Sequence, residues 1–143
     1  MEYSKAGDAL TSSFEQCRLK AYPDSGGVPT IAWGHTRGVA LGLTCIQEQA
    51  DAWRKEDEGY TVEAVNHLVT VQLTQAEFDA IVDFDFNVGN QALKNSTLLR
   101  LLNDGNFVGA AQEFDKWDHV KAVVVAGLLR RREAETKEFE GAD

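Results

Sequence analysis

Apolar residues recur at a helical period through the second half of the chain. Thr74 and Glu77 form a capping-box pattern ahead of residues 78–88, where apolar side chains nearly encircle the axis of a helix. These apolar positions are Phe78, Ile81, Val82, Phe84, Phe86 and Val88. A helix that is apolar on all sides belongs at the centre of a core, so we expect this one in the middle of a helical lobe. Shorter helical patterns follow over residues 96–105, 107–117 and 127–139.

A longer helical pattern, rich in polar residues, covers residues 47–69. A capping-box pattern from Thr44 to Gln47 marks its start, whereas Gly59 in its middle argues against one unbroken helix. A long helix with a polar, solvent-exposed surface is suited to joining two lobes, and we expect this segment to connect a small β lobe with the helical lobe.

Near the N-terminus, Ser4 is placed to cap a short helix that ends near Glu15. The predicted apolar side of this helix consists of Ala6, Ala9, Leu10 and Phe14. Residues 17–22 and 28–33 alternate in polarity as strands do, and a Pro-Asp-Ser-Gly-Gly turn joins them. The sequence therefore predicts a β-hairpin, and a third short strand could follow within residues 34–42.

Length and composition fit one globular domain, because the chain has 143 residues, of which 43% are hydrophobic and 26% charged. The formal net charge of −9 argues against nucleic-acid binding and against simple attraction to an anionic membrane or polymer. No window reaches the roughly 18 to 20 apolar residues of a membrane span, so stable membrane insertion is not expected. The N-terminal residues lack the apolar centre of a signal peptide, and Cys17 and Cys45 are expected to be unpaired thiols.

Glu15, Asp24 and Thr30 are the candidate chemistry around the predicted hairpin. If the turn folds back toward the end of the first helix, all three side chains could line one cleft. Glycoside hydrolysis needs one protonated acid for the leaving oxygen and one ionised acid to activate or orient water, which a nearby hydroxyl can hold. The alternative is a solvated glutamate at a helix end and a turn aspartate bonded to its own backbone. Spacing alone favours this alternative.

Residues 14–36, FEQCRLKAYPDSGGVPTIAWGHT, resemble the phage lysozyme family, the endolysins of the T-even and lambdoid type. That family carries a Glu, an Asp and a Thr at these separations, followed by a Gly-His pair. Later segments resemble further family segments in the family's order, namely LTQAEFDAIVDFDFNVG, STLLRLLNDG, AAQEFDKW and GLLRRREAE. The resemblance implies a single α+β, lysozyme-like domain over residues 1–143. In it, a small β-hairpin lobe (about 16–43) faces a larger helical lobe (about 60–143, with the first helix packed on it) across an active-site cleft.

The resemblance further implies a glycoside hydrolase that cleaves the β-1,4 bond between N-acetylmuramic acid and N-acetylglucosamine in peptidoglycan, with inversion at the anomeric carbon. Glu15 would be the general acid, Asp24 would position or deprotonate the attacking water, and Thr30 would hold that water. The family pairs its catalytic glutamate with an arginine from a late helix. Arg130, Arg131 and Arg132 are the candidates, of which we favour Arg131.

Further positions take their expected roles from the same resemblance. Asn87 lies in a Phe-Asn-Val-Gly motif that borders the sugar groove in the family, so it is a candidate substrate contact. His35 is expected to form a structural ion pair or a wall of the cleft. Trp33 could stack on a sugar or fill the β lobe. Ala32 stands where the family usually carries glycine and would crowd the backbone beside the cleft.

Asp83 and Asp85 depart from the small or apolar residues expected on this helix, and at least one of them should be buried and need a partner. For Asp85, surface exposure or a salt bridge is favoured over an extra acid in the cleft. With Asn87 they resemble the start of a calcium loop, but Val88 and Lys94 stand where an EF-hand needs Gly and Glu. The histidines show no ligand spacing either, so neither a metal nor a cofactor is expected.

The expected partner is the glycan strand of peptidoglycan, which a monomer made in the host cytoplasm would reach in the periplasm. The missing export signal indicates release through a partner pore, a holin. Two rival functions stay open, a lytic transglycosylase and a lysozyme-like protein that binds peptidoglycan without cutting it. The water-handling pair Asp24 and Thr30 favours the hydrolase over the first rival, whereas the acidic balance keeps the second one open.

Overall fold

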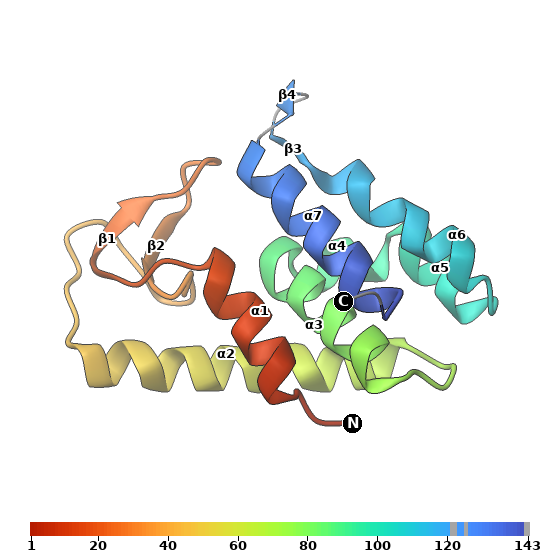
Figure 1. Cartoon of the computed structure of the whole chain (residues 1–143). Helices are drawn as coiled ribbons and strands as arrows, with labels where there is room; N and C mark the ends of the chain where they lie inside the picture. The colour runs from red at the N-terminus through yellow and green to blue at the C-terminus, as the bar shows by residue number, and fades with distance from the viewer. Residues whose placement is uncertain (121–122, 125, 142–143) are drawn as a thin grey trace.

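A long helix, α2 (Gln47–Leu68), connects a β-hairpin at one end of the molecule with a helical body at the other, as Figure 1 shows. The computed structural model describes residues 1–120, 123–124 and 126–141. The α2 helix continues through Gly59, which lies on an open surface where a side chain would meet nothing within 4 Å. The glycine therefore lowers the stability of the helix only through its poor helix propensity.

The helical body is built around α3 (Gln75–Val88), which packs against α1, α2 and α7. The other helices described are α1 (Lys5–Phe14), α4 (Asn90–Lys94), α5 (Thr97–Asn103), α6 (Phe107–Glu113) and α7 (Ala126–Phe139), with a 3-10 turn at Phe114–Trp117. The predicted central helix is confirmed, since Phe78, Ile81, Val82 and Phe84 are fully buried in the main hydrophobic cluster. A minimal hairpin, β3 (His119–Val120) with β4 (Val123–Val124), precedes α7.

Polar and small residues, not the predicted apolar ones, form the buried face of α1. Gly7 and Thr11 are its buried residues, whereas Ala6 and Ala9 are exposed. A Cβ on Gly7 would overlap the Tyr3 ring and lie 2.8 Å from the carboxyl carbon of Asp79, so glycine is what allows this close packing between α1 and α3. The Thr11 hydroxyl donates to the Asp83 carboxylate at 2.7 Å. Hydrogen bonds to α3 therefore decide which side of α1 is buried.

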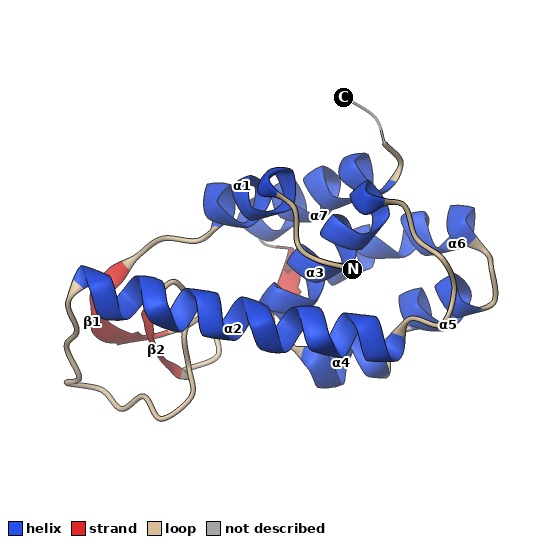
Figure 2. Ribbon diagram, turned by 90° about the horizontal axis from the view of Figure 1, so that it is seen from below, coloured by secondary structure: helices blue, strands red, loops and turns tan. Residues whose placement is uncertain are grey.

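The hairpin pairs β1 (Arg18–Pro23) with β2 (Pro29–Ala32) in antiparallel register, with Tyr22 opposite Thr30. Figure 2 shows the hairpin beside the N-terminal half of α2. Between them lies a small hydrophobic cluster formed by Ala21, Ile31, Ala32 and Ala50. The third strand considered for residues 34–42 is absent from this described segment, where Ile31 and His35 form only an isolated bridge.

Two remaining sequence expectations concern the ends of elements and the cysteines. The capping box predicted at Thr44 is wrong: α2 begins after Ile46, which gives no side-chain cap, and Thr44 instead pairs with Lys20 in a bridge. Cys17 and Cys45 are free thiols, as predicted. In the described part of the chain, no helix combines the length and the hydropathy needed to span a bilayer.

Candidate active site

Glu15 is held between the last helix and the loop that follows the hairpin. It caps α1 at its C-terminal end, where its backbone N–H donates to the Thr11 carbonyl at 3.0 Å. Its Oε1 accepts from Nη1 of Arg131 at 2.8 Å. On the other side, a Cβ built on Gly34 would lie 3.1 Å from its Oε2, so the carboxyl packs against bare backbone. The Glu15 side chain stays 17% exposed, which leaves it within reach of a bound molecule.

Arg131 connects Glu15 to the centre of the protein. Its side chain is 4% exposed, and its Nε and Nη2 donate to Asp83 at 3.0 and 2.9 Å. Of the three consecutive arginines, Arg131 is the one that contacts Glu15. Arg130 is exposed, and Arg132 forms an ion pair with Glu135 at 2.6 Å.

Asp83 is fully buried, and its partners are the Arg131 guanidinium, the Thr11 hydroxyl and the Glu135 carboxyl. Burial alone would raise the pKa of Asp83, but the hydrogen bond with Glu135 and the charge and hydrogen bonds of Arg131 hold that pKa below its usual value. Burial, together with the neighbouring Asp83 carboxylate, raises the pKa of Glu135 well above its ordinary range. The partner expected for a buried aspartate on this helix is therefore found on α7.

Asp24 and Thr30 lie in and beside the hairpin turn. Asp24 is exposed, and its Oδ1 accepts from the backbone N–H groups of Gly26 and Val28, both at 2.8 Å. These two bonds fix the direction of the carboxylate, as in an Asx turn. Thr30 is 4% exposed and donates its hydroxyl to the Val28 carbonyl at 2.8 Å, so its oxygen lone pairs stay available to accept a bond.

Two cavities meet the region around Glu15. The larger, of about 480 Å³, is lined by Glu15, Ser25 of the turn, Asn87 at the end of α3, and Arg130 and Arg131 of α7. The structure thus brings Glu15, Asn87 and Arg131 together. Asp24 adjoins this cavity through its neighbour Ser25 without lining it, and Thr30 does not line it either.

The smaller cavity, of about 190 Å³, begins at Gly34 and runs between the loop after β2 and the helices α2 and α3. Asp57 and Asp85 are among its lining residues. Asp85 is 1% exposed, and with the Asn90 amide turned to donate, its oxygens accept bonds of 3.0 and 2.7 Å. The favoured prediction of an exposed or salt-bridged Asp85 is therefore wrong. Burial raises the pKa of Asp85 to about 7.

Trp33 and His35 both reach toward α2. The Trp33 indole N–H donates to Asp51 at 2.9 Å. His35 is 5% exposed, hydrogen bonds Asp57 at 2.8 Å through Nδ1, and stacks on Trp53 with ring centres 4.7 Å apart. The His35–Asp57 contact has the geometry of the expected structural pair. Trp33 belongs to the packing between the hairpin and α2, and its contact with sugar stays a prediction.

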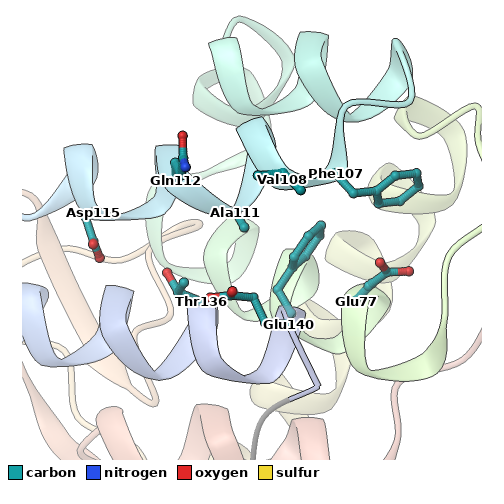
Figure 3. A pocket seen from close by; sticks show the side chains of 9 residues that line it. Glu77, Phe107, Val108, Ala111, Gln112, Asp115, Thr136 and Glu140 are labelled. Carbon is teal, nitrogen blue, oxygen red and sulfur yellow. The ribbon is translucent and has the colours of Figure 1, made fainter.

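A further cavity, of about 410 Å³, lies within the helical body, where Figure 3 shows Phe107, Val108 and Ala111 near Glu77 and Glu140. None of the predicted site residues lines it. Among the residues that the structure describes, no group of three or more His, Cys, Asp or Glu side chains is arranged to hold a metal ion.

Comparisons with known proteins agree on one family. Residues 12–135 match the family described as phage lysozyme. The endolysin of Acyrthosiphon pisum secondary endosymbiont phage 1 is 40% identical over 99% of this chain and 100% of its own length. The endolysin of Salmonella phage P22 is 40% identical over 82% of this chain and 84% of its own. The solved muramidase domain of SpmX from Asticaccaulis excentricus superposes with a TM-score of 0.84 at 40% identity, covering 96% of this chain and 97% of that domain.

Proposed function

This chain belongs to the phage lysozyme family and has its α+β, lysozyme-like fold, and from that premise we propose an inverting acid/base mechanism with Glu15 as the proton donor. The chain is a muramidase of the endolysin type and acts on peptidoglycan. The bond cleaved is the β-1,4 linkage between N-acetylmuramic acid and N-acetylglucosamine. The single observation that carries the proposal is the setting of Glu15, which an arginine and a bare backbone hold at the wall of a cavity between the turn and α7.

In the proposed reaction, the protonated Glu15 carboxyl donates to the glycosidic oxygen as the bond to the anomeric carbon breaks. Asp24, in the turn beside the cavity, orients and deprotonates the water that attacks from the opposite face of the sugar. An inverting enzyme needs about 6.5 to 9.5 Å between its two carboxyl groups, because that water stands between them. The Thr30 hydroxyl donates to the Val28 carbonyl, so its oxygen accepts a hydrogen bond from the water and fixes its position.

We place the glycan strand along the two cavities, one lined by Glu15 and the other by Gly34, because the Cβ position of Gly34 lies 3.1 Å from Oε2 of Glu15. The larger cavity presents Asn87 and Arg130, and the smaller one presents Arg37 and Asp57. A strand that crosses Gly34 passes the Glu15 carboxyl at close range, because no side chain stands between them. Asn87 is exposed and lines the larger cavity, where its amide can bond to an N-acetyl group.

Digestion of purified peptidoglycan by the wild type and by Glu15→Gln tests the proposal. We expect the variant to fold and to lose activity by a factor of about 10² to 10⁴, the usual contribution of a general acid. Glu133→Gln, the same substitution at an exposed site on α7, is the matched control and should keep wild-type activity. A folded Glu15→Gln enzyme with full activity would refute the assignment.

Mass spectrometry of the same digests decides between hydrolysis and transglycosylation. Hydrolysis adds water at the cleaved bond, whereas a transglycosylase leaves 1,6-anhydro ends that are lighter by one water. Asp24 and Thr30 support hydrolysis, since a transglycosylase has no need to hold a water. A binding protein without catalysis would sediment with the peptidoglycan and release no fragments at all.

The site of action that we propose is the periplasm, where the substrate lies, and we propose that a monomer reaches it through a holin pore. Expression alone should then leave host cells intact, and co-expression of a pore-forming partner should lyse them. Lysis by the protein alone would contradict the need for a pore. Light scattering behind a sizing column gives the mass in solution, which we expect to be that of one 15.8 kDa chain.

A further inference from the structure

Asp83 accepts two of the three hydrogen bonds that the structure shows from Arg131, the arginine that holds Glu15. The guanidinium presents Nε and Nη2 to Asp83 and Nη1 to Glu15. Asp83 has no exposed surface, and the Arg131 side chain is 4% exposed. Water therefore screens the contact between them little, and the charge of Asp83 balances much of the charge of Arg131.

This balance matters because Arg131 has two opposing effects on a proton donor. Its hydrogen bond orients the Glu15 carboxyl, which catalysis requires. Its positive charge, however, favours the ionised form of a neighbouring acid, and an ionised Glu15 cannot donate a proton. A second carboxylate bonded to the same guanidinium leaves the orienting hydrogen bond in place and weakens the tendency of Arg131 to ionise Glu15.

We propose that Asp83 is a positioning residue for proton donation, which acts through Arg131 and lets Glu15 keep its proton at the pH of catalysis. The inference rests on the proposed role of Glu15 as the general acid. It gives a function to an aspartate whose place on a mostly apolar helix is otherwise unexplained.

Other titratable groups act on the same ion pair. Arg132 and Glu135 on α7 interact electrostatically with Arg131, and Tyr3, ahead of α1, faces Asp83. Glu135 lies 3.9 Å from Nε of Arg131 and hydrogen bonds with Asp83. Glu135 is therefore placed to take over the role of Asp83 in part.

Asp79 offers a matched control, because it lies one turn before Asp83 on α3 and is equally buried, at 1% exposure. Its carboxylate accepts from the Ser4 backbone at 3.2 Å and from the Gln75 amide at 2.8 Å. None of its hydrogen bonds involves Arg131. Asp79→Asn and Asp83→Asn therefore remove the same charge from the same helix, but only the second changes the partner of Arg131.

The test is the pH dependence of kcat/KM for the wild type, Asp83→Asn and Asp79→Asn on soluble peptidoglycan fragments. Loss of the Asp83 charge should move the basic limb of the profile down by about one pH unit, the lower end of the roughly one to three units by which a charge beside an acid shifts it. The rate above that limb then falls about tenfold, while the rate at the optimum changes less. Asp83→Asn combined with Glu135→Gln should show the larger shift. Asp79→Asn should leave the limb within about 0.2 units of the wild type.

A basic limb that stays in place in folded Asp83→Asn would overturn the proposal, and so would an equal shift in Asp79→Asn. If Asp83→Asn does not fold, Thr11→Val supplies the test. This substitution removes the hydrogen bond that the Thr11 hydroxyl donates to Asp83, so the negative charge of Asp83 acts more strongly on Arg131. The basic limb of the pH profile should then move slightly upward. No shift or a downward shift in that variant refutes the inference. Failure of the proposed function would be recognised separately, because it would appear as full activity of Glu15→Gln, whatever the Asp83 variants show.

Discussion

Replacing Gly34 by alanine tests how closely the site depends on bare backbone next to Glu15. Gly34 has φ of +84°, a left-handed conformation that costs an alanine about 1 kcal/mol. For a chain of this size, that loss lowers Tm by about 3 to 5 °C. The new Cβ would also lie 3.1 Å from Oε2 of Glu15 and 3.6 Å from its carboxyl carbon.

The steric effect can be separated from the backbone strain. Ordinary contact begins near 3.4 Å, so the Glu15 carboxyl must move by about 0.3 Å and its 2.8 Å bond with Arg131 must change in geometry. If a misplacement of about 1 Å lowers the rate about 10²-fold, a movement of this size lowers kcat about fourfold. KM should change little, because the displaced group acts on the bond that breaks.

Gly38→Ala is the matched control for this experiment. Gly38 has φ of +69°, and a Cβ at this position would meet nothing within 4 Å, so the variant bears the same backbone strain without touching Glu15. Urea unfolding should show a similar loss of stability in both variants, and turbidity assays on outer-membrane-stripped cells should show slower lysis in Gly34→Ala alone. A Gly34→Ala enzyme with wild-type kcat, or equal slowing in the control, would refute the reasoning.

Three further substitutions, one of them with a control at Ala50, test other features of the molecule. Ala32 has φ of +58° and is fully buried, so Ala32→Gly loses a methyl group but relieves backbone strain, and its free energy of unfolding should stay within about 0.5 kcal/mol of the wild type. Ala50→Gly is the control, because Ala50 is equally buried but lies in a helix, and it should lower the free energy of unfolding by about 1.5 to 2 kcal/mol. Because burial raises the pKa of Asp85 to about 7, the folded state binds more protons than the unfolded state between about pH 4 and 7, and wild-type stability falls as the pH rises through that window. Urea unfolding of Asp85→Asn should therefore show a gain of about 2 to 4 kcal/mol relative to the wild type between pH 4.5 and pH 8, and a constant difference would contradict the burial argument. Trp33→Phe loses the bond to Asp51 and should lower stability by about 1 kcal/mol with kcat/KM unchanged, whereas a weaker binding of oligosaccharide would indicate a sugar contact.

Local chemistry accounts for the elements that the sequence predicts correctly. Thr74 and Glu77 form the expected capping box, with bonds of 3.1 and 2.7 Å, and Ser4 caps α1 by accepting from Gly7. In each case the partner lies three residues away, so the signal is contained in one short window. Thr44 shows the limit of such signals, because its backbone pairs with Lys20 and the capping pattern stays unused.

The buried charges could not be predicted from spacing, because their partners are distant in the sequence. Asp83 bonds to Arg131, which lies 48 residues further on, and to Thr11, which lies 72 residues earlier. A polar residue on an apolar helix indicates that some partner exists without saying which. The same limit explains the wrong prediction for the buried face of α1, since Thr11 is buried because of Asp83. The resemblance of the motifs, not their spacing, selected Glu15, Asp24 and Thr30.

The pair formed by Glu15 and Arg131 joins positions 116 residues apart, which has a consequence for biosynthesis. At about 5 to 20 residues per second, a ribosome adds Arg131 about 6 to 23 s after Glu15. Until then the nascent polypeptide has a glutamate without its guanidinium and an Asp83 without its cation. A product released early by a premature stop would carry the whole hairpin and still lack the last helix, so lytic activity requires that translation proceed through α7.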